Sequence, residues 1–172
     1  LISEGEFANP SGTPPTFEND EARLEGTLKA LQEVSPGSGA AQLARFYGAG
    51  VLVKLGKKDE AKAALRALAG ELSQKDTLYF LAVERLANLL EETGAAEDAI
   101  KEYERLSGPG GSFYRDEAQY QIARIHQTQG RADQARAILS GFKVSFPDST
   151  LNTEAEQRLG ELGEASAKAE VK

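Results

Sequence analysis

Few of the side chains in this sequence can carry catalysis or bind a metal ion. The chain has no cysteine and one histidine, His126, which excludes thiolate sites and zinc sites built from histidine pairs within one chain. A catalytic triad would need Ser and Asp side chains brought to His126 by the fold, and no nucleophile-elbow sequence is present. We therefore interpret His126 as a packing residue, and we expect a protein that is not an enzyme and holds no cofactor or metal.

The glycines and carboxylates form no recognised binding motif either. Residues 108–112 (Gly-Pro-Gly-Gly-Ser) lack the Lys-Ser/Thr pair that reaches phosphate in a P-loop. Carboxylates are numerous, but none forms a calcium-binding EF-hand loop or a Glu-x-x-His pair. Residues 108–111 are then either an ordinary loop or a hinge between two helical segments.

The distribution of charge argues against nucleic acid as a partner. The net charge is −7, and most of it lies in residues 1–39, which hold seven acidic and two basic side chains. Residues 40–149 hold fifteen of each sign, whereas a nucleic-acid-binding domain concentrates Lys and Arg on its folded part. No run of about 18 apolar residues exists, so we expect no membrane insertion by this chain itself.

The elements that must position any binding residue are helices. Good helix formers dominate, β-branched residues are sparse, and the prolines lie in the first fifteen residues or between helical patterns. We expect a flexible linker over residues 1–17 and a disordered tail over 166–172. The domain between them, residues 18–165, is predicted to contain helices at about 19–34, 39–55, 58–72, 76–93, 96–107, 113–129, 131–145 and 150–165.

A repeated signature joins these helices into pairs. Gly56, Gly94 and Gly130 recur at intervals of 38 and 36 residues. Each glycine is expected to end one helix in the left-handed conformation, so that the chain folds back into the next helix. An alanine stands seven residues before and five residues after each glycine, which lets the two helix backbones approach closely; these pairs are Ala49 and Ala61, Ala87 and Ala99, and Ala123 and Ala135. A fixed period in this range is typical of a helical solenoid.

This pattern resembles the tetratricopeptide repeat, a helix–turn–helix unit of about 34 residues. The family has small residues at positions 8 and 20, usually Gly at 15 and Pro at 32. With the three glycines at position 15, the alanines fall at 8 and 20, and Pro147 falls at 32 of the third unit. The Trp of position 4 is missing, and position 27 holds Leu68, Leu106 and Phe142 instead of a small residue. The resemblance implies an all-α, antiparallel helix-pair solenoid of about three repeats with flanking helices.

The resemblance also implies that the first helix of each pair lines a concave protein-binding face. In the family, positions 2, 5, 9 and 12 of that helix face the groove. Here they are Leu43, Phe46, Gly50 and Val53 in the first unit, Leu81, Glu84, Asn88 and Glu91 in the second, and Glu117, Tyr120, Arg124 and Gln127 in the third.

Each of these groups has two interpretations. The first-unit residues Leu43, Phe46 and Val53 are either buried under the helix at 19–34 or form an apolar pocket that anchors a partner segment. Glu84 and Glu91 either solvate an exposed face or contact a basic segment of a partner. Tyr120 and Arg124, which lie four residues apart and share a helix face, are either a packing pair or a recognition pair.

The function implied is that of a non-catalytic scaffold for a protein or peptide partner. The junctions at 36–38 and 146–149 look like those of bacterial envelope tetratricopeptide proteins, such as the ancillary subunit of the Sec translocon and the lipoproteins of β-barrel assembly. That likeness implies a periplasmic or membrane-tethered domain with an anchor or signal before Leu1, while a cytoplasmic location stays open. Two other interpretations also stay open: a self-associating structural subunit without an open groove, and a binder of a small molecule or lipopeptide near Phe46.

Overall fold

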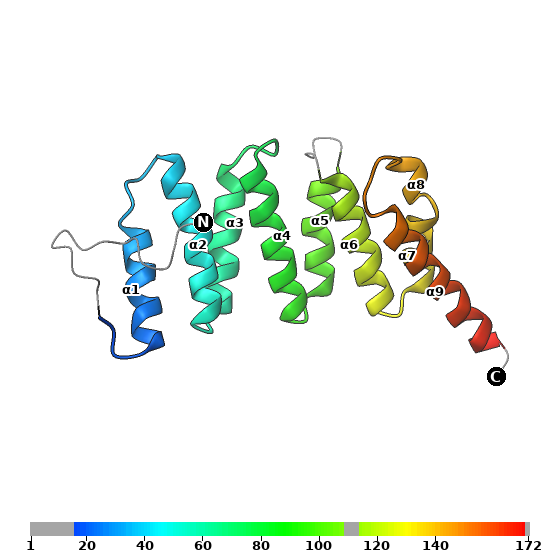
Figure 1. The fold of residues 1–172 in the computed structure, drawn as a ribbon, viewed down its shortest axis with the longest axis horizontal. Coiled ribbons are helices and arrows are strands. Elements are labelled where there is room, and N and C mark those ends of the chain that lie inside the picture. The colour runs from blue at the N-terminus through cyan, green and yellow to red at the C-terminus, as the bar shows by residue number, and fades with distance from the viewer. Residues whose placement is uncertain (1–15, 109–113, 171–172) are drawn as a thin grey trace. The chain divides into compact units, whose positions relative to one another are not determined.

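The computed structural model describes residues 16–108 and 114–170, with side chains described up to residue 164. Throughout these residues the regular structure is helical and contains no strand, so the predicted all-α helical-repeat fold is confirmed (Figure 1). The chain divides into two compact units, Leu1–Glu71 and Leu72–Lys172, and each is described by itself below. The domain predicted over residues 18–165 spans both units and stays a prediction.

The first unit contains three helices: α1 (Asp20–Gln32), α2 (Gly39–Lys54) and α3 (Lys58–Glu71). The side chains of Asn19 and Ser38 cap α1 and α2 by accepting hydrogen bonds from backbone N–H groups at 2.8 and 3.1 Å, as expected for these residue types at a helix start. Helix α1 packs against α2 but contains no fully buried residue. Its Leu28 lies against Gly48 of α2, where a Cβ atom would come within 3.5 Å of the leucine methyl.

The second unit continues with α4 (Thr77–Glu92), α5 (Ala96–Ser107), α6 (Arg115–Thr128), α7 (Ala132–Ser140), α8 (Phe142–Ser145) and α9 (Asn152–Glu170). Helices α4 to α7 follow one another side by side, each packed on the next, and α9 packs on α7 and α8 (Figure 1). Most of the large, fully buried side chains belong to this unit, including Tyr79, Leu86, Tyr103, Leu106, Ile125 and Phe142.

The three predicted glycine corners are confirmed by the backbone. Gly56, Gly94 and Gly130 have φ of +75°, +81° and +72°, in the left-handed region that favours glycine. At each corner two hydrogen bonds close the helix end; at Gly94 they are the Ala95 N–H donating to the Leu90 carbonyl at 2.8 Å and the Gly94 N–H donating to the Glu91 carbonyl at 2.9 Å. This arrangement satisfies carbonyls that the helix end leaves without a partner.

The predicted alanine seam is also confirmed. All six alanines that flank the corners are buried, with Ala49 at 1% exposure and the others at 0%. The two helices that each corner joins, α2 with α3, α4 with α5 and α6 with α7, are in contact. The small side chains therefore let these helices approach closely, and larger apolar residues such as Leu65, Tyr103 and Leu139 fill the space on either side.

Two helix boundaries differ from the prediction. The single helix expected over 131–145 is divided at Gly141 into α7 and α8, because glycine holds the helical conformation weakly and the bend brings Phe142 into the core at 1% exposure. Helix α9 runs to Glu170, five residues past its expected end at 165. Residues 165–170 (Ala-Ser-Ala-Lys-Ala-Glu) contain no helix breaker, so most of the expected tail is helical backbone.

Other expectations fall partly outside the described residues. Residues 1–15 of the expected linker and residues 109–111 of the expected loop or hinge are not described, nor are residues 112 and 113. Phe17, at the end of the linker, lies against Gly26 of α1, where a Cβ atom would come within 2.6 Å of the ring. None of the helices in the described part of the chain is both long and apolar enough to cross a bilayer.

Candidate protein-binding face

The groove positions of the first predicted repeat lie on α2, in the first compact unit, and are only partly covered. Leu43 is 48% exposed, so its burial under α1 is not what the structure shows, and its neighbour one turn on, Tyr47, is 54% exposed. Phe46 and Val53 are half-buried, and the Phe46 ring meets the Tyr47 ring edge-on at 5.8 Å between centroids. Gly50 is buried. The first unit therefore presents Leu43 and Tyr47 as an exposed apolar strip on α2.

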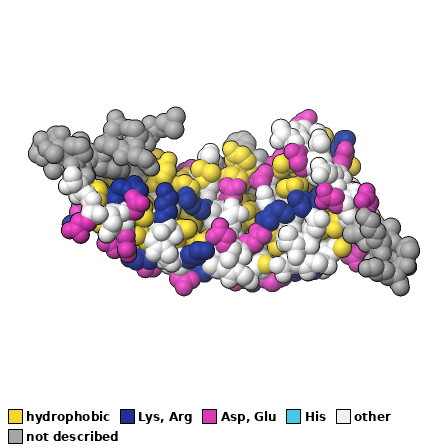
Figure 2. Space-filling view, turned by 60° about the horizontal axis from the view of Figure 1, so that its bottom comes forward, with side chains coloured by type: hydrophobic (Ala, Val, Ile, Leu, Met, Phe, Trp, Pro, Cys, Tyr) yellow, Lys and Arg dark blue, Asp and Glu magenta, His cyan; other side chains and the backbone are white. Residues whose placement is uncertain are grey.

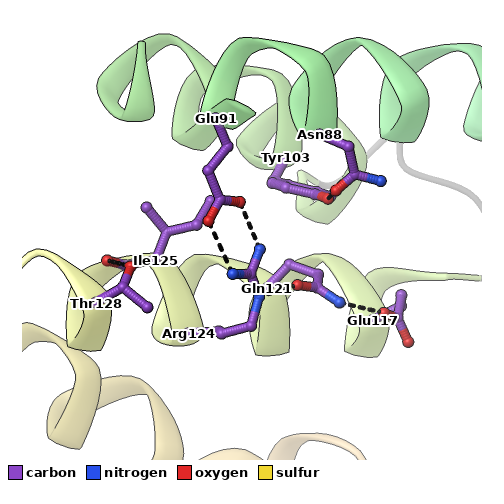
Figure 3. Close-up of polar contacts among 8 residues, drawn as sticks. All are labelled: Asn88, Glu91, Tyr103, Glu117, Gln121, Arg124, Ile125 and Thr128. Atoms are coloured by element: carbon purple, nitrogen blue, oxygen red, sulfur yellow. Dashed lines mark hydrogen bonds and ion pairs between the residues drawn. The ribbon is translucent and has the colours of Figure 1, made fainter. Parts of the chain in front are cut away.

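In the second compact unit, Glu91 of α4 and Arg124 of α6 point toward one another and form an ion pair (Figure 3). The guanidinium of Arg124 donates to both carboxylate oxygens of Glu91 at 2.8 and 2.6 Å, with each side chain about one-quarter exposed. This hydrogen bonding lowers the pKa of Glu91 and raises that of Arg124. The negative charge of Glu91 is thus balanced by Arg124 within the chain, and Glu91 is not free to receive a basic residue of a partner.

The ion pair continues along α6 as a chain of hydrogen bonds. Arg124 Nε donates to the side-chain oxygen of Gln121 at 2.6 Å, and the Gln121 amide donates to Glu117 at 2.8 Å (Figure 3). On the α4 side, the buried Tyr103 of α5 donates its hydroxyl to the side-chain oxygen of Asn88 at 3.0 Å. Burial raises the pKa of Tyr103, so it stays a neutral donor. Most of the polar groups of this face are therefore held in fixed orientations.

Glu84 is the exception on this face. It lies on α4 one turn before Asn88, is half-buried, and has no hydrogen-bond or ion-pair partner among the described residues. Burial, and next the charge of Glu117 on α6, raise the pKa of Glu84 above its usual value. The negative charges of Glu84 on α4 and Glu117 on α6 therefore act on one another, and Arg124 of α6 is already paired with Glu91.

Tyr120 and Gln127 contact Arg158, which was not among the predicted groove residues. Arg158 of α9 donates from Nη2 and Nε to the Tyr120 hydroxyl at 3.1 and 3.3 Å and from Nη1 to the Gln127 side-chain oxygen at 2.5 Å. Its guanidinium carbon also lies 5.3 Å from the centroid of the Tyr120 ring. Tyr120 and Arg124 are each also engaged by a side chain from another helix, Arg158 and Glu91 respectively.

Exposed apolar side chains lie on the same helices as these polar groups. Leu81, one turn before Arg85 on α4, is 37% exposed, and Tyr114 at the start of α6 is 40% exposed with its ring stacked on Phe80 at 4.0 Å. On the face drawn in Figure 2, acidic, basic and apolar side chains are intermingled over the described surface. Among the three carboxylates at groove positions, Glu91 is ion-paired, whereas Glu84 and Glu117 have no ion pair with a described residue.

His126 is half-buried on α6, and its Nδ1 atom is buried without a hydrogen-bond partner among the described residues. Arg131, which follows the Gly130 corner, pairs with Glu97 of α5. Burial, and next the charge of Arg131, lower the pKa of His126, while Glu97 and Glu104 act in the opposite direction. Within the described residues, no three His, Cys, Asp or Glu side chains are placed to hold a metal ion.

His126 gives a prediction about pH. Because its pKa is lower in the folded chain than in the unfolded chain, the unfolded state binds the proton more readily. Stability should therefore fall as the pH drops through about 6.5, the ordinary pKa of histidine. Urea unfolding at several pH values between about 7.5 and 5.5 should show this fall, and it should be smaller in His126→Gln. Identical profiles for the two proteins would show that His126 is not linked to folding.

Sequence comparison supports one repeat directly. The tetratricopeptide repeat family model matches residues 117–149, the segment from the first groove residue of α6 to the serine before α9. The match coincides with the third predicted repeat, the one that contains Gly130. No curated protein matches the sequence. The sequence match to the tetratricopeptide repeat covers residues 117–149, and the helix pairs in the rest of the described residues are similar to it in arrangement.

Proposed function

We propose that the chain is a scaffold that binds a segment of a partner protein on the face formed by α4 and α6, the interaction face hereafter. In this proposal a basic residue of the partner lies between Glu84 and Glu117, and an apolar residue next to it contacts Leu81. Tetratricopeptide repeats in general mediate protein–protein interaction, which supports a partner of this class. The observation that carries the proposal is the half-buried carboxylate of Glu84, which has no partner among the described residues.

The charge of the partner can be inferred from the charges that are already engaged within the chain. Arg124 is held by Glu91, and Arg158 lies against Tyr120 and Gln127, so neither contacts Glu84. A carboxylate that is partly removed from water loses hydration, and a nearby second carboxylate adds repulsion. A cationic side chain placed between Glu84 and Glu117 would offset both unfavourable terms, whereas an acidic segment would add to them.

We further propose that this interaction takes place in the bacterial cell envelope, with residues 1–17 as a tether. Support comes from the likeness of the helix junctions at 36–38 and 146–149 to those of envelope tetratricopeptide proteins. The gene sequence upstream of the codon for Leu1 tests this part directly. A hydrophobic span or a lipid-attachment cysteine there would agree with it, and an uninterrupted hydrophilic domain would argue for another compartment.

The test of binding is a selection from a random peptide library displayed on phage, with the whole chain as bait. We expect enriched peptides to share a Lys or Arg next to an apolar residue, because one cationic and one apolar site are adjacent on the interaction face. Synthetic versions of these peptides should bind Glu84→Gln and Glu117→Gln more weakly, with a loss that shrinks at high salt.

The matched control is Glu104→Gln, which removes the same charge from an exposed position on α5. This variant should bind the selected peptides as the unsubstituted chain does. The proposal would be wrong if the enriched peptides were acidic or without a common basic residue, or if Glu104→Gln weakened binding as much as Glu84→Gln. Sedimentation of the peptide-free chain over a range of concentrations shows whether the chain associates with itself instead of binding a partner segment.

A further inference from the structure

The contact between α6 and α9 resembles the contact between α4 and α6 in that an arginine reaches back to the preceding first helix, but the groups that hold the arginine differ. Arg158 follows Arg124 by 34 residues, the length of one repeat. Arg124 reaches back to Glu91 of the preceding first helix, and Arg158 reaches back to Gln127 of α6 in the corresponding way. The carboxylate that holds the first arginine is thus replaced by a neutral amide at the second.

Arg158 is consequently held by neutral groups. Its contacts are the Tyr120 hydroxyl, the Tyr120 ring and the Gln127 side-chain oxygen, and it has no ion pair with a carboxylate of the described residues. Hydrogen bonds between a charged donor and a neutral acceptor lack the mutual attraction of two charges that holds Arg124 on Glu91. The Arg158 guanidinium can therefore be exchanged at lower cost than that of Arg124.

Helix α9 is fixed by contacts that do not involve Arg158. Ala155 and Leu162, one turn on either side of Arg158, are 2% and 4% exposed in a core cluster with Leu139 and Phe142. Lys143 of α8 also pairs with Glu156 of α9 at 2.7 Å. The side chain of Arg158 can thus leave Tyr120 while α9 stays in place.

We propose that Tyr120 and Gln127 form an arginine-binding subsite that Arg158 fills within the chain and that an arginine of the partner occupies in its stead. This rests on the proposed function, because Glu117 and Tyr120 lie three residues apart on the same face of α6 and would contact neighbouring basic residues of one segment. A planar guanidinium suits the subsite better than an ammonium, since it stacks on an aromatic ring and donates in two directions at once.

The first experiment uses the chain with Arg158→Ala and the ethylguanidinium ion as probe, with the ring resonances of Tyr120 followed by NMR. We expect a saturable shift of these resonances in Arg158→Ala, a weaker response to ethylammonium, and little response in the unsubstituted chain, where Arg158 occupies the subsite. The matched control is Arg136→Ala, which removes another arginine that donates to α9, at the Leu162 carbonyl, but leaves Arg158 in place. It should respond as the unsubstituted chain does.

A second variant keeps the test decisive if Arg158→Ala folds poorly. Gln127→Glu restores the carboxylate found at Glu91, so it should hold Arg158 more firmly and reduce the affinity for selected peptides that contain two arginines. Equal peptide affinity in this variant, or no response to ethylguanidinium in folded Arg158→Ala, would overturn the subsite. If instead no basic peptide is enriched by the unsubstituted chain, the proposed function fails while the ethylguanidinium result still stands.

Discussion

Replacing Phe142 by alanine is expected to lower the free energy of unfolding by about 3–5 kcal/mol, the usual cost of removing a large aromatic ring from a core. Phe142 is 1% exposed, and its ring lies 6.4 Å from that of Tyr120 and 5.1 Å from that of Phe146 between centroids. It shares a core cluster with Ala123, Ala135 and Leu139, so the cavity would lie where α6, α7 and α9 meet. Urea unfolding followed by circular dichroism measures the change.

Val144 provides the control within the same short helix. It is 86% exposed, so Val144→Ala should change the unfolding free energy by no more than about 0.5 kcal/mol. If Phe142→Ala and Val144→Ala had equal small effects, α8 would not be packed on the second unit as the structure has it.

Replacing Ala99 by leucine is expected to lower the unfolding free energy by about 1–3 kcal/mol, because a side chain larger by three carbon atoms must fit where two helices are closely packed. Ala99 is 0% exposed, and its counterpart across the Gly94 corner, Ala87, is 0% exposed as well. Thermal or urea unfolding of the variant measures the loss. The exposed Ala137 of α7 is the matched position, and Ala137→Leu should be nearly neutral. A neutral Ala99→Leu would mean that α4 and α5 do not approach closely at this alanine.

The helix pairs could be predicted because their signals are local. A glycine that ends a helix and an alanine at a fixed distance on each side act within a few residues, and each appears in the structure where expected. The break at Gly141 was missed because a glycine inside a helical pattern is often tolerated. Here the burial of Phe142 decides in favour of the bend.

The interaction face could be predicted only in part, because its contacts join residues about one repeat apart. Arg124 and Glu91 are 33 residues apart, and Arg158 and Tyr120 are 38 apart. Helix periodicity relates only neighbours three or four residues apart, so it grouped Tyr120 with Arg124 and gave no sign of Arg158. The repeat length itself was the available signal: adding 34 to the position of Arg124 gives Arg158 on the next first helix.

The same limit explains why the acidic and apolar groove positions Glu84, Glu91 and Leu43 have different surroundings in the structure. Glu91 is balanced by a residue of the next repeat, and Glu84 is left uncompensated, although both were equally acidic groove positions in the sequence. Leu43 is half-exposed because α1 covers α2 through Leu28 and Gly48, farther along the helix. Which groove residues remain available to a partner is thus set by packing between repeats and not by the residue types alone.

The most direct test of the interaction face is to locate a bound peptide on it. A selected basic peptide is titrated into the isotopically labelled chain, and the backbone amide shifts are mapped by NMR. The account predicts the largest changes on α4 around Leu81 to Asn88 and on α6 around Glu117 to Gln121, with little change on α5 and α7. Changes concentrated on α5 and α7, or on α2 near Leu43 and Tyr47, would contradict it.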